Sequence, residues 1–229
     1  MAGHEEAARI LKEARDRGRR VLSEYDAKAF LGAFGIPVCR EVVARDGEEA
    51  VEAARGLGYP VVLKGLGERL THKTELGAVS LHLADAAAVR AEAGRILKID
   101  GCEALLVQEM VKGLRELVCG LLRDPHFGPC VMFGLGGILT EILRDNTFRV
   151  APLTREEASA MMEDIRGRAV LEPFRGEAAV DRETLCGILT ALGEVGIRFP
   201  EIAEIDINPL KIRPDGKIAA VDALVVLAE

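Results

Sequence analysis

Neither tryptophan nor any apolar run long enough to cross a membrane occurs in this chain of 229 residues. A membrane-spanning helix needs about 20 consecutive apolar residues, so the sequence predicts no membrane segment. The first residues, Met-Ala-Gly-His-Glu-Glu, lack the basic and then apolar order of a secretory signal peptide. These absences predict a cytosolic protein.

The sequence also lacks closely spaced cysteines. The five cysteines are odd in number, and none has the Cys-x-x-Cys spacing that is typical of structural zinc sites and redox motifs. We therefore expect buried thiols in a reducing compartment. Basic residues are fewer than acidic ones, and the formal net charge of −7 argues against general nucleic-acid binding.

What the sequence does contain is an alternation of helical and extended patterns with 49% hydrophobic residues. The alternation predicts an α/β or α+β protein of one domain or two small lobes. We expect an N-terminal helix (1–21), a first lobe (22–100) and a second lobe (101–229). The expected strands are 38–44, 60–65, 79–83, 104–111, 114–122, 130–133 and 138–143, and the expected helices begin at Ser23, Glu48, Asp85, Thr154 and Asp181.

The end of the chain predicts a β-hairpin that brings an asparagine and an aspartate together. Pro214-Asp215-Gly216 separates two β-branched runs and suits a three-residue hairpin loop. If Arg213 pairs with Lys217, the same register sets Asn208 opposite Asp222, on the polar face that also carries Asp206. Amide and carboxylate oxygens are ligands for Mg²⁺, which proteins often hold together with substrate phosphates. The alternative is a solvated hairpin face without a ligand.

The longest irregular segment, residues 65–77, follows a buried strand that ends in Lys64. A lysine in that position is costly to bury unless its ammonium group meets an anion such as phosphate, although a salt bridge would serve as well. The loop carries His72, whose imidazole is either a reactive group or an ordinary surface side chain. Farther along, Gly134-Leu-Gly-Gly137 would let the backbone approach a phosphate, but it matches neither common phosphate-binding motif.

Taken together, these segments resemble the ATP-grasp β subunits of ADP-forming acyl-CoA (acetyl-CoA) synthetases. The resemblance covers almost the whole chain, and the C-terminal hairpin is also similar to the metal-binding hairpin of succinyl-CoA synthetase β subunits. The motifs that carry it, in family order, are Ala-Lys-(x)₂-Leu-(x)₃-Gly-Ile-Pro (27–37), Pro-Val-Val-Leu-Lys (60–64), His-Lys-Thr-Glu-Leu-Gly (72–77), Val-Gln-Glu-Met-Val (107–111), Arg-Glu-Leu (115–117), Asp-Pro-His-Phe-Gly-Pro (124–129), Phe-Gly-Leu-Gly-Gly (133–137), Phe-Arg-Val-Ala-Pro-Leu (148–153) and Glu-Ile-Asp-Ile-Asn-Pro-Leu (204–210).

The resemblance implies an α+β ATP-grasp fold whose two lobes clamp a nucleotide, with ATP or ADP and Mg²⁺ as cofactors. It implies that the chain works only with a CoA-binding α subunit, in an α₂β₂ assembly, and that the reaction is acyl-CoA + ADP + phosphate ⇌ carboxylic acid + CoA + ATP. The implied roles are a transient phosphohistidine at His72, phosphate binding by Lys64, an adenine-binding hinge at Glu109, Met110 and Val111, a place beside the nucleotide for Glu116, and Mg²⁺ ligation by Asn208 and Asp222.

Three positions depart from the family pattern: Gly67 replaces a usual serine, Glu75 a usual aspartate, and Ala78 a common glycine. Two other functions stay open at this point. One is an ATP-grasp carboxylate–amine ligase that forms an acyl phosphate without a phosphohistidine. The other is a non-catalytic nucleotide-sensing subunit. The sequence does not fix the acyl group or the choice between ADP and GDP.

Overall fold

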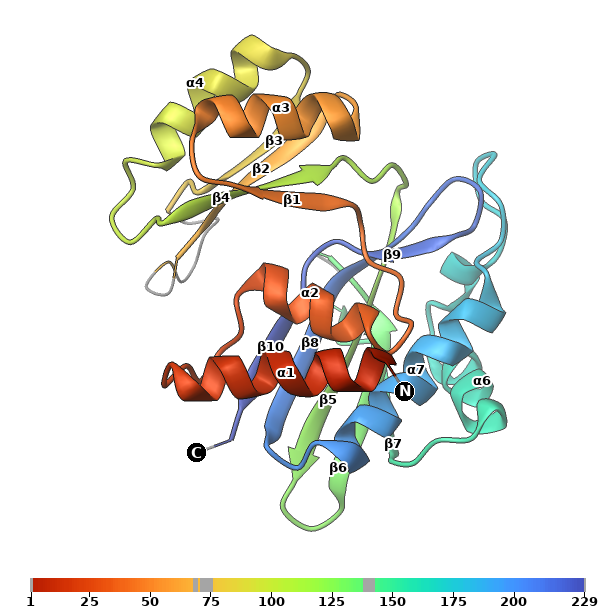
Figure 1. Ribbon diagram of the computed structural model, residues 1–229. Helices are drawn as coiled ribbons and strands as arrows, with labels where there is room; N and C mark the ends of the chain where they lie inside the picture. Colours follow the sequence, from red (N-terminus) through yellow and green to blue (C-terminus); the bar gives the residue numbers. More distant parts are fainter. Residues whose placement is uncertain (1, 68–69, 71–75, 138–142, 229) are drawn as a thin grey trace. The chain divides into compact units, whose positions relative to one another are not determined.

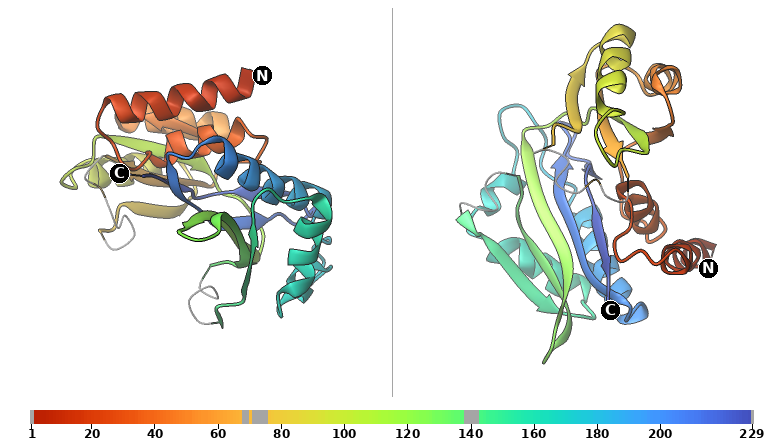
Figure 2. Two further views of the ribbon diagram at one scale, coloured as in Figure 1. Left: turned by 90° about the horizontal axis from the view of Figure 1, so that it is seen from below. Right: turned by 90° about the vertical axis from the view of Figure 1, so that its left-hand side faces the viewer.

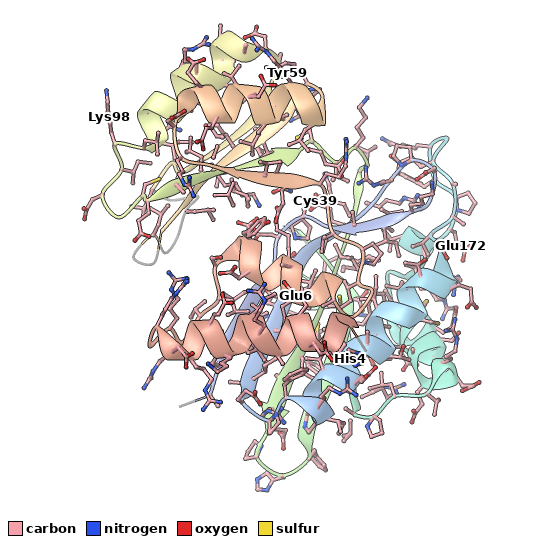
Figure 3. All side chains as sticks on the ribbon, viewed as in Figure 1. His4, Glu6, Cys39, Tyr59, Lys98 and Glu172 are labelled. Carbon is pink, nitrogen blue, oxygen red and sulfur yellow. The ribbon has the colours of Figure 1, made fainter. Side chains whose placement is uncertain are left out.

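The computed structural model describes residues 2–67, 70, 76–137 and 143–228. The chain divides into two compact units, a smaller one of Cys39–Met110 and a larger one that combines Met1–Val38 with Val111–Glu229. Cys39, labelled in Figure 3, is therefore the first residue of the smaller unit. Among the described residues, no helix is long and apolar enough to cross a membrane.

The smaller unit is an antiparallel sheet with two helices packed on one face (Figure 1). The strand order is β1-β4-β2-β3. Asp46 and Asp85 start the two helices, because each side chain accepts backbone N–H groups of the first turn. The elements are β1 (Glu41–Ala44), α3 (Gly47–Leu57), β2 (Val61–Leu66), β3 (Val79–Leu83), α4 (Ala86–Ile96) and β4 (Ala104–Glu109).

The larger unit is built on a six-stranded antiparallel sheet of order β10-β8-β5-β6-β7, with β9 paired to β8. Its helices and strands come from both ends of the chain. They are α1 (Ala2–Asp16), α2 (Glu24–Gly32), β5 (Arg115–Asp124), β6 (Gly128–Leu135), β7 (Asn146–Val150), α6 (Arg155–Asp164), a 3₁₀ helix (Arg168–Leu171), α7 (Arg182–Arg198), β8 (Ile202–Ile212), β9 (Ile218–Ala220) and β10 (Leu224–Leu227).

One face of this sheet forms the core of the larger unit. Leu117 and Cys119 of β5 stand opposite Leu210 and Ile207 of β8, and all four are completely buried. The same cluster includes apolar residues of α1, α2, α6 and α7. In Figure 2, α1 and α7 lie on the same side of these strands. Because strand residues alternate between faces, the polar side chains between these core positions lie on the other face of the sheet.

Local sequence signals explain where several elements begin. Ser23 caps α2, and Asp181 caps α7, each by accepting a backbone N–H with its side chain. Thr154 and Glu157 form the reciprocal capping box that the sequence predicts at the start of α6. The predicted antiparallel hairpin and the α+β class are likewise confirmed, since every ladder between the described strands is antiparallel.

The contact division differs from the boundaries we expected near residues 21 and 100. Residues 22–38 group with the C-terminal part because α2 packs into the core of the larger unit. Residues 101–110 group with the preceding segment because β4 pairs with both β1 and β2. These are non-local pairings, which hydrophobic periodicity does not report.

One strand was not expected, and one expectation is only partly described. β7 pairs with β6 through Asn146–Val150, an alternating edge strand whose side chains are exposed or half-buried. The strand was missed because its exposed and half-buried residues give only a weak hydrophobic pattern. The strand expected at 138–143 lies outside the described residues except for Leu143, which is helical.

Candidate functional site

The C-terminal hairpin has the register that its loop predicts. The backbone N–H of Arg213 donates to the carbonyl of Lys217, and Leu210 pairs with Ala220 farther along the ladder. Beyond residues 221–223, which belong to no strand, β10 continues in the same register, with Leu224 opposite Asp206. Carried across this gap, the register sets Asn208 opposite Asp222, as expected from the sequence.

The polar face of β8 is also as predicted. Ile205 and Ile207 are buried in the core, whereas Glu204 is exposed and Asp206 and Asn208 are half-buried. Burial, together with the nearby carboxylates of Glu204 and Asp222, raises the pKa of Asp206 to about 6. Glu204 and Asp206 of β8 and Asp222, which lies between β9 and β10, therefore share one patch of negative potential, and a bound cation would reduce it.

Asn208 links this patch to the glycine-rich segment. Its Oδ1 accepts a hydrogen bond from the backbone N–H of Gly137 at 3.1 Å. An amide oxygen has two lone pairs, so Oδ1 can also ligate a cation. Gly137 has a positive φ of 63°, and a Cβ on it would stand 2.1 Å from Oε2 of Glu116. Glycine is therefore favoured there by the backbone conformation, and a Cβ would also force the Glu116 carboxylate to move.

Glu116 sits beside these groups and pairs across the sheet with a lysine. Lys211 is its partner on β8, and the Nζ–Oε1 distance is 3.3 Å. The backbone carbonyl of Glu116 also accepts the N–H of Gly136 at 2.9 Å. Lys211 was not singled out in the sequence, whereas Gly137 was noted only as part of the glycine-rich segment. The pairing of β5 with β8, which would have identified Lys211, is not a local feature.

The donor set on this face suits a hard cation. Among the described residues, no group of three or more histidine, cysteine or acidic side chains is arranged to hold a metal. Of the oxygen groups on this face, the amide of Asn208 and the carboxylate of Asp222 are the two that the hairpin register sets opposite each other. This limited set fits Mg²⁺, which commonly takes one or two protein ligands and fills its remaining positions with phosphate oxygens and water.

In the smaller unit, Lys64 lies in the central strand β2, between Val79 of β3 and Leu106 of β4. The residue is only 6% exposed. A β2 strand that ends at Leu66 and a β3 strand that starts at Val79 delimit the loop in which we expect the reactive histidine. His72 itself lies outside the described residues, as does Glu75.

The other two departures from the family pattern have simple packing surroundings. A Cβ on Gly67 would lie 1.8 Å from the carbonyl oxygen of Gly101, so a serine cannot replace it without a shift of the backbone. Ala78 is fully buried, and its carbonyl accepts the N–H of Gly65 at 2.8 Å. Gly67 and Ala78 are therefore both closely packed against the smaller unit.

The segment expected to bind adenine begins at the end of β4. The carboxylate of Glu109 accepts a hydrogen bond from the backbone N–H of Arg40 at 3.0 Å and lies 3.4 Å from the Arg40 guanidinium. Met110 is the last residue of the smaller unit, and Val111 is the first residue of the segment that returns to the larger one. Residues 110–113 belong to no strand, so their backbone groups take no part in the hydrogen-bond ladders of either sheet.

Comparison with known proteins matches residues 13–227 to the ATP-grasp domain family. The β subunit of ADP-forming acetate–CoA ligase I from Pyrococcus furiosus is 40% identical over 228 residues, which cover 96% of this chain and 97% of that protein. ADP-forming acetate–CoA ligase I from Archaeoglobus fulgidus is 36% identical, and the match covers 98% of this chain but 33% of that longer protein.

A similar fold is seen in acetyl-coenzyme A synthetase 1 from Ca. Korarchaeum cryptofilum. That structure holds coenzyme A and Mg-AMPPCP, with its phosphohistidine segment pointing towards the nucleotide binding site. The two structures superpose with a TM-score of 0.86 at 40% sequence identity, and the match covers 97% of this chain and 100% of the other.

Proposed function

Since the chain belongs to the ATP-grasp family, and to its branch of ADP-forming acyl-CoA synthetase β subunits, we propose that it is the nucleotide-binding subunit of such an enzyme. The reaction is acyl-CoA + ADP + phosphate ⇌ carboxylic acid + CoA + ATP. The observation that carries this proposal is the joining of Asn208 to Gly137 and of Glu116 to Lys211 on one sheet face, in a chain that matches such β subunits along its length.

On this face, Asn208 and Asp222 would hold Mg²⁺ through one amide and one carboxylate oxygen. The bound cation supplies charge neutralisation for the nucleotide phosphates. Gly137 positions the Asn208 amide through its N–H. Glu116 would sit beside the nucleotide, and its carboxylate is kept in place by Lys211.

The remaining nucleotide contacts are assigned to the smaller unit and to the segment that leaves it. Lys64 would donate to the phosphates, since a buried ammonium group is best stabilised by an anion. Residues Glu109, Met110 and Val111 would form the adenine hinge. The Glu109 side chain is engaged by Arg40, so the base would meet mainly backbone groups there.

We assign the phosphoryl carrier role to His72. A phosphorus–nitrogen bond forms at its imidazole as the corresponding bond to a histidine of the α subunit breaks. An oxygen of the ADP β-phosphate then attacks phosphorus, and the bond to His72 breaks. A carrier on a loop fits a reaction divided between two subunits, because phosphoryl transfer needs close, in-line approach at each site.

The proposed partner is a CoA-binding α subunit in an α₂β₂ assembly. The Pyrococcus furiosus relative is itself a β subunit, whereas the Archaeoglobus fulgidus relative is about three times as long as the matched region. Cytosolic placement is part of the proposal, and it is supported by five cysteines that are all free thiols.

The test is to mix this chain with the α subunit and to follow ATP formation from ADP, phosphate and a panel of acyl-CoA thioesters. We expect turnover that needs both subunits and Mg²⁺. A panel without any turnover, combined with tight nucleotide binding, would instead support the nucleotide-sensing alternative. ATP cleavage to ADP and phosphate that requires a carboxylic acid and an amine, but not CoA, would support the carboxylate–amine ligase alternative.

A further inference from the structure

A charged pair is buried in α2, one turn apart on the same side of the helix. Lys28 Nζ lies 2.9 Å from Oε1 of Glu24, and the side chains are 1% and 3% exposed. Charged groups are rarely buried this completely, because removing them from water is costly. The neighbouring helix α1 offers a contrast, since its Lys12–Asp16 pair has the same spacing but is 76% and 62% exposed.

The segments on either side of α2 are tied to the strands that surround Asp222. Before the helix, the N–H of Leu22 donates to the carbonyl of Val225 in β10 at 3.0 Å. After it, the carbonyl of Pro37 accepts the N–H of Ala220 in β9 at 2.9 Å. The helix is therefore anchored to both strands that flank residues 221–223, which themselves belong to no strand.

Lys28 reaches this short connection directly. Its Nζ donates a long hydrogen bond, of 3.5 Å, to the carbonyl oxygen of Val221. The N–H of the same residue donates to the carbonyl of Pro209 at 3.2 Å. Val221 is thus held on one side by the residue that follows Asn208 and on the other by the buried lysine. It directly precedes Asp222 in the chain.

The energetics argue that this pair serves a purpose other than stability. A buried ion pair gains little or no net stability over apolar side chains of similar size, because the desolvation cost offsets the attraction. What such a pair does provide is a fixed direction for its hydrogen bonds. Here the Lys28 ammonium group points to the carbonyl of Val221, in the peptide bond that joins Val221 to Asp222 of the proposed metal site.

We propose that Glu24 and Lys28 are a positioning pair for that site. Glu24 orients the Lys28 ammonium group, which fixes the Val221 carbonyl and thereby sets the Asp222 carboxylate opposite Asn208. This inference rests on the proposed function, since it deepens the metal site assigned there. Groups that orient a metal ligand commonly contribute about 10- to 100-fold in metal affinity.

The test measures Mn²⁺ binding to the full chain by electron paramagnetic resonance, with a non-hydrolysable ATP analogue present. The double variant E24Q/K28M removes both charges without leaving either one buried alone. The swapped variant E24K/K28E keeps a pair but takes the ammonium group away from Val221. We expect both to bind Mn²⁺ at least about tenfold more weakly, with unfolding temperatures close to that of the unchanged chain.

Two matched variants make the result specific. K12M/D16N removes the exposed pair of α1 and should leave Mn²⁺ affinity unchanged. Asp222→Ala should weaken it at least as much as the α2 variants do. If Asp222→Ala has no effect, the metal assignment itself is wrong.

If Asp222→Ala weakens binding but a folded α2 variant binds Mn²⁺ normally, only the positioning role is overturned. Failure of both α2 variants to fold would also overturn it, because the pair would then serve stability. If only one of the two α2 variants folds, the Mn²⁺ affinity of that variant decides whether the positioning role holds.

Discussion

The backbone N–H of Gly137 donates to the side-chain oxygen of Asn208 across 71 residues of sequence, at 3.1 Å. This contact connects the glycine-rich segment at the end of β6 to the proposed metal hairpin. It means that the conformation of the glycine-rich segment constrains the side chain of the proposed ligand Asn208, so changes at Gly137 or Asn208 should affect the same measurement.

Asn208→Ala should abolish Mg²⁺-dependent nucleotide binding, because the variant loses both the proposed ligand oxygen and its link to Gly137. The fold should persist, since Asn208 is half-buried on the polar face rather than part of the core. Calorimetric titration with Mg-ATP measures the effect. Asn146→Ala, at an exposed position of β7, is the control that should bind normally. Unchanged Mg-ATP binding by Asn208→Ala would refute the ligand assignment.

Gly137→Ala should weaken nucleotide binding and also destabilise the fold. The residue has φ of 63°, and the new Cβ would collide with the carboxylate that Lys211 holds. Gly128→Ala separates the two effects, because its φ is 77° but nothing lies within 4 Å of the added Cβ. Both variants should lose about 1–2 kcal/mol from the left-handed backbone. Only Gly137→Ala should lose nucleotide affinity, and equal affinities for the two variants would contradict the site.

Lys64→Met should reduce nucleotide affinity by about 1.5–3 kcal/mol, the usual contribution of a hydrogen bond to a charged group. The effect should be larger for ATP than for adenosine, because the lysine is assigned to the phosphates. Lys98→Met, at an exposed residue of the same unit (Figure 3), is the control. An equal loss for adenosine and ATP would mean that Lys64 acts on the fold instead.

His72→Ala should prevent phosphorylation of the chain by Mg-ATP. A phosphoramidate is labile in acid and stable in base, which identifies the labelled residue type. The variant should still bind nucleotide, since the proposed metal pair lies in a different unit of the chain. His126→Ala, at an exposed turn, should keep the label. Normal acyl-CoA turnover by His72→Ala together with the α subunit would exclude the carrier mechanism.

Asp145 should make the larger unit sensitive to acid. Burial by itself raises the pKa of this carboxyl, but the backbone N–H groups of Arg166 and Gly167 and the Arg166 guanidinium outweigh burial and lower it. The N–H donors lie 2.9 and 2.6 Å from the two oxygens. A lowered pKa in the folded state adds stability above the unfolded pKa of about 3.9, and this stability is lost as the pH falls through the folded value.

Asp145→Asn should therefore cost about 1.5–3 kcal/mol of unfolding free energy at pH 7 and little once the pH is below the lowered pKa of Asp145 in the folded state. Urea unfolding at a series of pH values measures this difference. Asp16→Asn, which changes an exposed ion pair of α1, should cost less than about 1 kcal/mol throughout. A loss for Asp145→Asn that does not depend on pH would refute the electrostatic explanation.

The sequence by itself determined the features that depend on short-range chemistry. The loop Pro214-Asp215-Gly216 fixed the hairpin register, because loop length and turn type leave little freedom to the flanking strands. Side-chain caps fixed the starts of helices at Ser23, Thr154 and Asp181, since each cap acts within one turn. These local rules were sufficient to bring Asn208 and Asp222 into register.

Only the tertiary structure decided which distant segments meet. The Glu116–Lys211 pair depends on β5 lying beside β8, and the contact of Gly137 with Asn208 depends on the packing of the segment after β6. The Glu24–Lys28 spacing is typical of an ordinary surface pair. It is buried because chain segments on both sides of α2 are bound to the C-terminal strands. Burial and long-range pairing follow from the packing of the whole unit, which no local pattern encodes.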